Sequence, residues 1–397
     1  MDEGRRESEP EGGGRHRASL TAALPGYSGR VLLARTDIVG SLLRPPELLE
    51  ARERFVRGEL TAEQLERAED AAVDWALRLQ EEAGLEVVTD GEMRRLSFQS
   101  QLPAAVEGFG EWDLDAFLWG EWRSDELGDL EIERPPIAVT GRLRRRRFLS
   151  AHEFAYARGC TDRVLKVTLP SPSLFANFWD PERSSDAYPS LEEFLGDVAE
   201  ILHEEADELV RLGATYLQLD APHYPLLLDE GYRAFYESRG WPADRWLDLG
   251  LELDNHVIGD RPGVTFGLHL CRGNQVSRWL VAGGYDGLAA KIFPRVRAQR
   301  LLLEYDDERS GGFEPLALVP EDKVAVLGLV TTKTGRLETA EELAARIREA
   351  SAFCPLERLA LSPQCGFATS VLGNALTVDE ERAKLRRIVE TAAEVWG

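Results

Sequence analysis

Long helical patterns alternate with short apolar runs along most of this chain, and this alternation restricts its fold more than any other feature. Residues 61–83 show the pattern best, because Thr61 and Gln64 suit a capping box, an apolar stripe follows one helix face, and Gly84 ends the pattern. The apolar run 85–90 comes next and ends in polar residues. The same order recurs, with helical patterns at 190–212 and 377–395 and apolar runs at 215–220, 264–270, 300–304, 323–330 and 358–361.

Repeated units of this kind predict a parallel sheet with helices packed outside it. Their number favours a closed barrel over an open sheet. No G-x-G-x-x-G or Walker-type loop follows an apolar run, which argues against a nucleotide-binding open sheet. The expected fold is therefore α/β, a (β/α)8 TIM barrel with an insertion near the barrel mouth.

The chain divides into three regions of different character. Residues 1–28 are rich in Gly, Glu, Arg and Ser, and we expect a disordered tail there. Residues 29–397 are expected to form a single catalytic barrel. Between 100 and 160 the alternation stops, which predicts an insertion, either a lid over the barrel mouth or a segment packed on the barrel side.

Composition limits the partners and the compartment. The formal net charge of -23 argues against nucleic-acid and anionic-membrane partners and favours small-molecule ligands. No apolar run approaches the roughly 18 residues of a membrane span, and the first residues show no secretory signal. Four cysteines are too few for a disulfide framework in 397 residues, so we expect reduced thiols and a cytoplasmic protein.

Ligand-type side chains lie at the ends of the predicted strands. His269 and Cys271 are two residues apart in an apolar strand, so both point to the same face. Cys365 follows the last apolar run. One imidazole and two thiolates suit Zn²⁺ and leave one position open for chemistry, although the ligand types and spacing alone fit a buried histidine and two inert thiols better. In a TIM barrel such strand ends form the active site.

An ordered set of motifs resembles the cobalamin-independent methionine synthase family over about residues 30–380. The chain is most similar to the short, single-barrel members, which correspond to the catalytic C-terminal half of the long enzymes. The motifs are Ile38-Val39-Gly40-Ser41, Asp90-Gly91-Glu92, Gln218-Leu219-Asp220, His269-Leu270-Cys271, Glu304-Tyr305-Asp306 and Pro363-Gln364-Cys365-Gly366.

The resemblance implies roles for particular residues. It implies that zinc is held by His269, Cys271, Glu304 and Cys365. Glu304 is then the ligand expected to leave when sulfur arrives, because a hard carboxylate binds zinc less strongly than a soft thiolate. It further implies that Ser41 binds the carboxylate of homocysteine, and that Glu92 and Asp220 bind its ammonium group.

The implied function is a zinc-dependent thiol S-methyltransferase. A methyl or alkyl group would pass from a donor such as methyltetrahydrofolate to a thiol, here homocysteine, giving methionine or a related thioether. A methylated corrinoid protein and a small methyl compound are the other donors considered. The chain departs from the long enzymes where their late catalytic histidine is replaced near Lys333, so His223 and Lys333 become the candidate catalytic residues.

Two alternatives stay open. Epoxyalkane:coenzyme M transferases look similar around the zinc motifs and open an epoxide with a zinc-bound thiolate; Lys333 or Arg94 would then serve the sulfonate. Uroporphyrinogen decarboxylase has a similar barrel and works without metal, so a metal-free lyase or binding protein is the second alternative.

Overall fold

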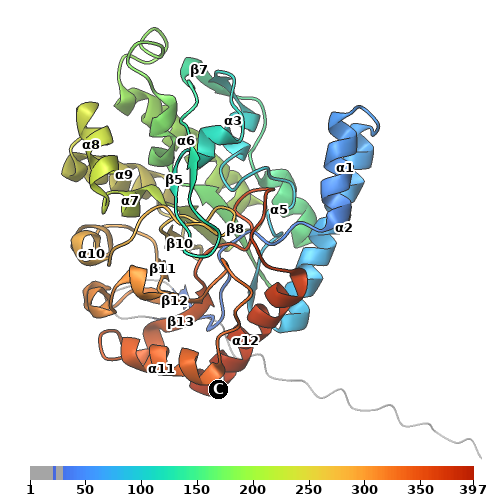
Figure 1. Cartoon of the computed structure of the whole chain (residues 1–397), viewed down its shortest axis with the longest axis vertical. Coiled ribbons are helices and arrows are strands. Elements are labelled where there is room, and N and C mark those ends of the chain that lie inside the picture. The colour runs from blue at the N-terminus through green and yellow to red at the C-terminus, as the bar shows by residue number, and fades with distance from the viewer. Residues whose placement is uncertain (1–20, 24–29) are drawn as a thin grey trace, which may run out of the picture.

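A seven-stranded parallel sheet forms the centre of the computed structural model, which describes residues 21–23 and 30–397 (Figure 1). Its strands are almost entirely buried, as expected for a parallel sheet covered by helices. In spatial order they are β13 (Leu359–Pro363), β12 (Val324–Val330), β11 (Arg300–Glu304), β10 (Thr265–Leu270), β9 (Tyr216–Asp220), β8 (Val164–Pro170) and β3 (Val87–Val88). The predicted parallel sheet is confirmed.

The expected closure by an eighth regular strand is not seen within the described residues, where the sheet curls but counts seven strands. Beside β13, Thr36 makes one parallel bridge with Leu361, and the N–H of Asp37 donates to the Leu361 carbonyl at 3.0 Å. On its other side the Thr36 N–H donates to the carboxylate of Glu86, just before β3, at 2.9 Å. The segment at Thr36 therefore lies beside both edge strands, but a side-chain carboxylate takes the place of a backbone ladder.

Amphipathic helices surround the sheet (Figure 1). The predicted helix at 61–83 is confirmed as α2 (Ala62–Ala83), with the Thr61–Gln64 capping box and Gly84 at φ 94° after its last turn. The other helices of eight or more residues are α1 (Pro46–Val56), α5 (Ala151–Arg158), α6 (Leu191–Arg211), α8 (Glu230–Ser238), α9 (Ala243–Ile258), α11 (Ala340–Ala350) and α12 (Val378–Trp396). Shorter helical segments are α7 (His223–Leu226), α10 (Asp286–Ile292), η1 (Pro172–Phe178), η2 (Glu308–Ser310), η3 (Glu314–Leu318) and η4 (Leu356–Arg358).

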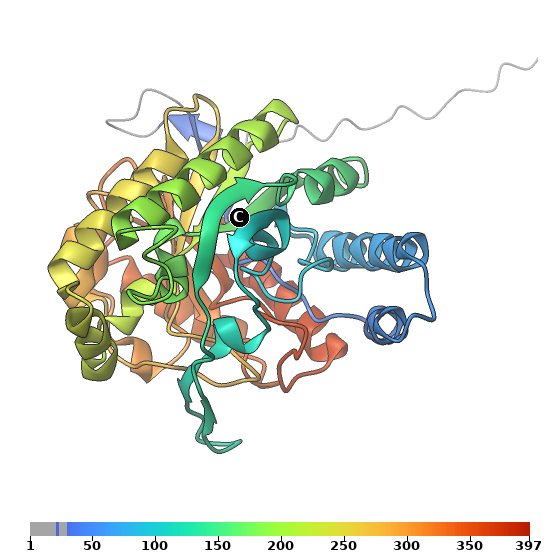
Figure 2. The same cartoon turned by 90° about the horizontal axis from the view of Figure 1, so that it is seen from above.

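The region predicted as an insertion builds two small antiparallel sheets outside the parallel sheet, β4 with β7 and β5 with β6. Figure 2 shows the hairpin of β5 and β6 projecting from the body of the molecule. Helix α5 also falls within 100–160, but it packs on α2, α6 and β8 like the other outer helices. The elements of this region are α3 (Gln101–Ala105), β4 (Val106–Phe109), α4 (Asp115–Leu118), β5 (Gly120–Trp122), β6 (Leu130–Ile132) and β7 (Val139–Arg145).

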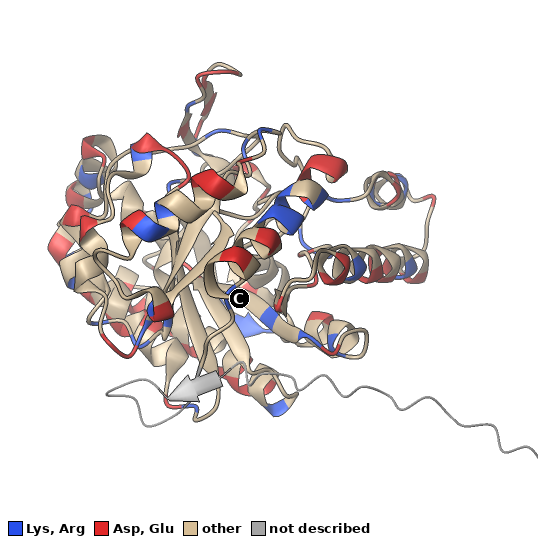
Figure 3. Ribbon diagram, turned by 90° about the horizontal axis from the view of Figure 1, so that it is seen from below, with Lys and Arg blue, Asp and Glu red and all other residues tan. Residues whose placement is uncertain are grey.

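The predicted tail, 1–28, lies mostly outside the described residues. Its described part, β1 (Thr21–Ala23), pairs antiparallel with β2 (Arg30–Leu32). Acidic and basic residues are interspersed over the outer helices (Figure 3). Within the described part of the chain, no helix has the length and apolarity needed to cross a membrane.

Candidate metal centre and thiol pocket

One pocket collects most of the predicted site residues at the carboxyl ends of the strands. Its cavity volume is about 100 Å³. Of the nine residues predicted for the site, the pocket is lined by Ser41, Glu92, Asp220, His223, His269, Cys271 and Cys365. The other two, Glu304 and Lys333, are not among its lining residues and form an ion pair with each other at 3.2 Å.

Three buried side chains form a potential metal site in this pocket. One ligand atom from each of His269, Cys271 and Cys365 lies within 4.8 Å of the others. His269 is in β10, Cys271 follows the end of that strand, and Cys365 follows β13, where the N–H of Gln364 donates to the Val330 carbonyl at 2.9 Å. The predicted gathering of these three residues is therefore present.

The orientation of the imidazole suits a metal ligand. Nδ1 of His269 lies 3.3 Å from the carbonyl oxygen of Leu302, and Nε2 is buried without a hydrogen-bond partner. A histidine that donates one ring N–H to a backbone carbonyl presents its other nitrogen to a metal. This orphaned nitrogen and two adjacent thiols fit the donor set that Zn²⁺ prefers.

The two thiols influence each other strongly. A hydrogen bond between them lowers the pKa of Cys271 well below its usual value and raises the pKa of Cys365 well above it. His269 also lowers the pKa of Cys271. Cys271 is thus the more readily ionised thiol, and a thiolate is the form that binds metal.

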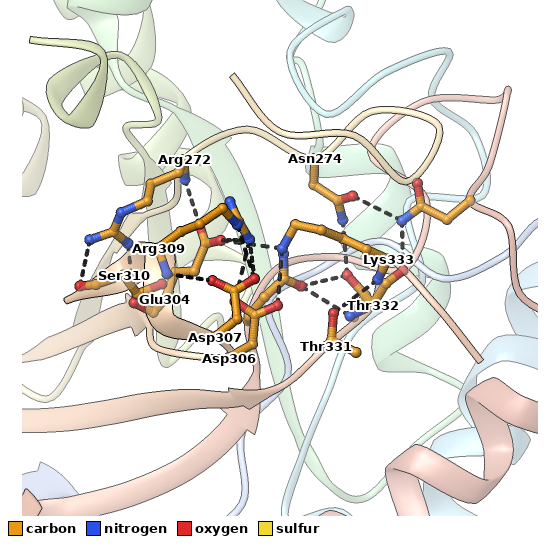
Figure 4. Close-up of polar contacts among 12 residues, drawn as sticks. Arg272, Asn274, Glu304, Asp306, Asp307, Arg309, Ser310, Thr331, Thr332 and Lys333 are labelled. Atoms are coloured by element: carbon orange, nitrogen blue, oxygen red, sulfur yellow. Dashed lines mark hydrogen bonds and ion pairs between the residues drawn. The ribbon is translucent and has the colours of Figure 1, made fainter. Parts of the chain in front are cut away.

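Glu304 lies close to this group but has protein partners of its own (Figure 4). It ends β11, one residue beyond Leu303, which pairs with Leu270 of β10, and this register places Glu304 beside Cys271. Its Oε2 accepts a hydrogen bond from the backbone N–H of Arg272 at 2.6 Å, and its Oε1 lies 3.2 Å from Lys333 Nζ and 3.7 Å from Arg309. Glu304 is outside the three-residue group, so its role as a metal ligand stays a prediction.

Lys333 serves as a buried counter-charge. Its Nζ lies 3.0 Å from Asp306 and 3.2 Å from Glu304. Burial alone would lower its pKa, but these two carboxylates outweigh burial and raise it. Lys333 is therefore a cation paired with acids, which does not favour direct contact with a substrate.

Ser41 is positioned by the loop that carries Cys365. The N–H of Phe367 donates to the Ser41 carbonyl at 2.8 Å. A Cβ atom on Gly366 would come within 2.0 Å of Ser41 Oγ, so only glycine permits this approach. Ser41 and the Cys365 loop are thereby held together.

The two acids predicted to bind an ammonium group are both buried in the pocket wall. Glu92 is a non-glycine residue at φ 57°; its Oε1 accepts a 2.6 Å hydrogen bond from Thr168, and its Oε2 is buried without a partner. Asp220 ends β9 and accepts a hydrogen bond from Gln218 at 2.7 Å. Burial raises the pKa of Asp220 to about 7, and the nearby His269 opposes this increase. Glu92 Oε1 also pairs with the buried Arg95 at 3.5 Å, so its Oε2 and the Asp220 carboxylate are the groups that would gain from a cationic ligand.

His223 lines the pocket as a neutral imidazole. Its Nε2 lies 2.7 Å from the hydroxyl of Ser173, and its Nδ1 is buried without a hydrogen-bond partner. Burial lowers the pKa of His223 to about 3. An imidazole that is neutral at pH 7 does not deliver a proton as imidazolium, so these surroundings do not favour the predicted catalytic role.

Aromatic side chains form an aromatic wall in the lining of the same pocket, and most come from the region between 98 and 122. Phe117 packs on Phe178 with ring centroids 5.5 Å apart, and Trp119 packs on Tyr232 at 5.7 Å. Phe178 lines the pocket, whereas the indole of its neighbour Trp179 donates to the Tyr188 carbonyl at 3.1 Å. The aromatic residues of the lining are Phe98, Phe117, Trp119, Trp122, Phe178 and Tyr232.

Several supporting residues were not predicted from the sequence. Thr168 and Gln218 hold the two acids, and Asn274 donates to both Thr332 Oγ1 and the Gly366 carbonyl at 2.9 Å. Asn274 follows Cys271 by three residues, so its place after a strand end was the available signal. Gln218 belongs to the Gln218-Leu219-Asp220 motif, although no role followed from it, whereas Thr168 looks like an ordinary residue of a strand core and carries no such signal.

Comparisons with known proteins agree with this geometry. A family model for the catalytic domain of cobalamin-independent synthases matches residues 34–394. The chain is 35% identical over 365 residues to uncharacterized protein YxjH of Bacillus subtilis (strain 168), covering 91% of this chain and 94% of that protein. It is 27% identical over 332 residues to a methionine synthase of Thermococcus kodakarensis, covering 83% and 86% of the two chains.

A solved structure from Listeria monocytogenes, assigned as a vitamin-B12-independent methionine synthase, is also similar. Its TM-score is 0.69 at 28% sequence identity, with 91% of this chain and 98% of that chain covered. The match to the family model spans nearly the whole chain, and five of the six motifs contribute residues to one pocket. The chain therefore belongs to the family of cobalamin-independent synthases.

Proposed function

We propose that this protein is a zinc-dependent methyltransferase that transfers a methyl group to the sulfur of homocysteine, forming methionine. The observation that carries the proposal is the meeting of two residue sets in one pocket: the metal-ligand group of His269, Cys271 and Cys365, and the two buried acids Glu92 and Asp220. Membership in the synthase family supports the reaction class. The four cysteines are free, which agrees with action in the reducing cytoplasm.

Different side chains would bind the carboxylate and the ammonium group of an amino-acid thiol. Ser41 offers a hydroxyl to the substrate carboxylate, while Asp220 and the unpartnered Oε2 of Glu92 offer negative charge to its ammonium group. Bound zinc would hold the substrate sulfur as a thiolate, the nucleophilic form, at neutral pH. The sulfur–methyl bond then forms as the donor's bond to the methyl carbon breaks, and the electron pair leaves with the donor.

The aromatic wall is the proposed site of the methyl donor. Flat rings such as those of Trp119 and Phe178 suit a planar group like the pterin of methyltetrahydrofolate, because aromatic surfaces stack favourably. The wall lines the same pocket as the metal-ligand group, so donor and thiol would be held close together in one site.

The charge of the pocket argues against a coenzyme M-type reaction. A sulfonate thiol needs a cation, yet the described residues that line the pocket include neither Lys nor Arg. The two cations considered for that role are engaged elsewhere: Lys333 pairs with Glu304 and Asp306, and Arg94 pairs with Asp70 and stacks on Tyr156 at 4.8 Å. Glu92 and Asp220 would repel a sulfonate.

Zinc K-edge X-ray absorption on the purified protein, with and without homocysteine, tests the proposal. One zinc with two sulfur ligands that gains a third on adding homocysteine is the expected result. Zinc that gains a sulfur ligand on adding coenzyme M, but not on adding homocysteine, would favour the epoxide-opening alternative. A protein that binds no zinc would contradict the proposal and favour a metal-free function of the uroporphyrinogen decarboxylase kind.

A further inference from the structure

We infer that Lys333 is a positioning residue that receives the carboxylate of Glu304 when a substrate thiol replaces it on the metal. This inference rests on the proposed function, since it concerns the exchange of a zinc ligand. It differs from the predicted catalytic role of Lys333, because here the lysine touches neither substrate nor metal. It acts by giving Glu304 a second place to bind.

The first observation is that both carboxylate oxygens of Glu304 already have protein partners (Figure 4). Oε2 accepts the backbone N–H of Arg272 at 2.6 Å, and Oε1 faces Lys333 at 3.2 Å and Arg309 at 3.7 Å. A buried carboxylate without such partners would be costly. These two hydrogen-bond donors and the Arg309 ion pair therefore define a stable position for the carboxylate among protein groups.

The second observation is that Glu304 lies next to the metal-ligand group. Strand register places Glu304 beside Cys271, and the Glu304 carboxylate accepts the N–H of Arg272, the residue after Cys271, at 2.6 Å. Glu304 is thus next to the Cys271 side of the metal-ligand group. A change of its side-chain rotamer is the movement that the inference assigns to the exchange.

The third observation is the balance of charge in the cluster that Figure 4 shows. Three acids and three bases pack together there, and they are Glu304, Asp306, Asp307, Lys333, Arg309 and Arg272. When Glu304 faces Lys333 the cluster is neutral. When Glu304 turns to the metal, the cluster keeps one unmatched positive charge, which favours the return of the carboxylate. Lys333 therefore makes release of Glu304, and so binding of the thiol, more favourable.

Lys333→Met tests the inference, because methionine keeps an unbranched side chain only one atom shorter but removes the charge. We expect zinc to bind at least threefold more tightly, and the Kd for homocysteine to rise at least tenfold, because Glu304 is then harder to displace. X-ray absorption should show the oxygen ligand retained at a homocysteine concentration that replaces it in the wild-type protein. Lys333→Arg should restore both affinities to within about threefold of wild type.

Lys323→Met is the matched control. Lys323 is a buried lysine at the opposite end of the same strand, where it donates to the carbonyls of Val296 and Ala298 at 2.6 and 2.7 Å. This control should leave both affinities unchanged. In the Glu304→Gln background, Lys333→Met should no longer weaken homocysteine binding, since the charge it balances is gone. If Lys333→Met does not fold, Arg309→Gln should change the zinc and homocysteine affinities in the same directions, by smaller factors.

The outcomes separate the inference from the proposed function. If the wild-type protein exchanges oxygen for sulfur as proposed, but Lys333→Met binds zinc and homocysteine like wild type, the inference is wrong and the function stands. The inference is equally wrong if Lys333→Met weakens homocysteine binding by the same factor in the Glu304→Gln background. If the wild-type protein binds no zinc, the proposed function is wrong, and the inference with it.

Discussion

Gln218 Nε2 donates a hydrogen bond to Asp220 Oδ1 at 2.7 Å, while the Oε1 of the same Gln218 accepts one from Lys166 at 2.7 Å. Because Lys166 also pairs with Asp37 at 2.9 Å, a chain of polar contacts runs from the interior of the curled sheet to the pocket. This chain fixes the Asp220 carboxylate at the end of β9. The pocket acid is therefore held in place before any ligand binds.

Replacing that acid should weaken binding of the substrate amine. We expect Asp220→Asn to raise the Kd for homocysteine about tenfold or more, because a buried ion pair is lost, and to leave zinc content unchanged. Isothermal titration with homocysteine and with 4-mercaptobutanoate, which lacks the amine, measures this. The analogue should bind both proteins alike, and an equal loss for both thiols would contradict the ammonium-binding role. Asp254→Asn is the control, since Asp254 is a buried acid held by Ser171 and Tyr224.

Removing one thiol of the metal-ligand group should abolish tight zinc binding. We expect Cys271→Ser and Cys365→Ser to lower zinc affinity at least a hundredfold, because a neutral hydroxyl is a much poorer ligand than a thiolate. Cys354→Ser should keep full zinc content, since Cys354 is a buried thiol outside the group. Metal analysis after dialysis against a chelator gives the readout. Equal zinc content in all three variants would rule out this ligand set.

Asp37 should be important for stability. Its carboxylate accepts from Lys166 at 2.9 Å, Tyr216 at 2.8 Å and Arg300 at 3.1 Å, and all of these side chains are buried. Asp37→Asn leaves two buried cations short of a counter-charge, so we expect a loss of about 3–5 kcal/mol in the free energy of unfolding. Denaturant unfolding measures it. The exposed Glu50→Gln should change stability by less than about 0.5 kcal/mol, and a similarly small effect at Asp37 would show that the cluster is not stabilising.

Glu381 should make stability depend on pH. Burial raises its pKa to about 8, opposed by the hydrogen bond from the Leu43 N–H at 3.1 Å. The folded protein therefore keeps a proton that the unfolded chain loses above about pH 4.5, so stability falls as pH rises from about 4.5 to 8. Glu381→Gln should remove this loss, which approaches several kcal/mol at about 1.4 kcal/mol per pH unit.

Thermal unfolding from pH 5 to pH 9 tests the effect of Glu381. The gain in Tm from Glu381→Gln should grow with pH and level off above pH 8. Glu394→Gln, an exposed position on the same helix, provides the control. A gain that does not vary with pH would show that packing, and not ionisation, distinguishes the two proteins.

Much of the architecture could be predicted because it depends on local and periodic features. The capping box of Thr61, the apolar stripes and the order of helices and strands depend on residues that are close together in the sequence. The approximate place of His269, Cys271 and Cys365 also followed from strand ends, since parallel strands bring their carboxyl ends to one edge. Residue types alone could not show that the eighth strand position is filled by a single bridge at Thr36.

The sequence by itself determined the strand–helix alternation and the chemical types of the candidate ligands, because periodicity and side-chain chemistry are local properties. Only the tertiary structure decided which charges meet. Glu304 pairs with Lys333, 29 residues away, and the neutral state of His223 results from burial among residues of other segments. Contacts and desolvation of this kind depend on how distant segments pack, so they cannot be predicted from a local sequence pattern.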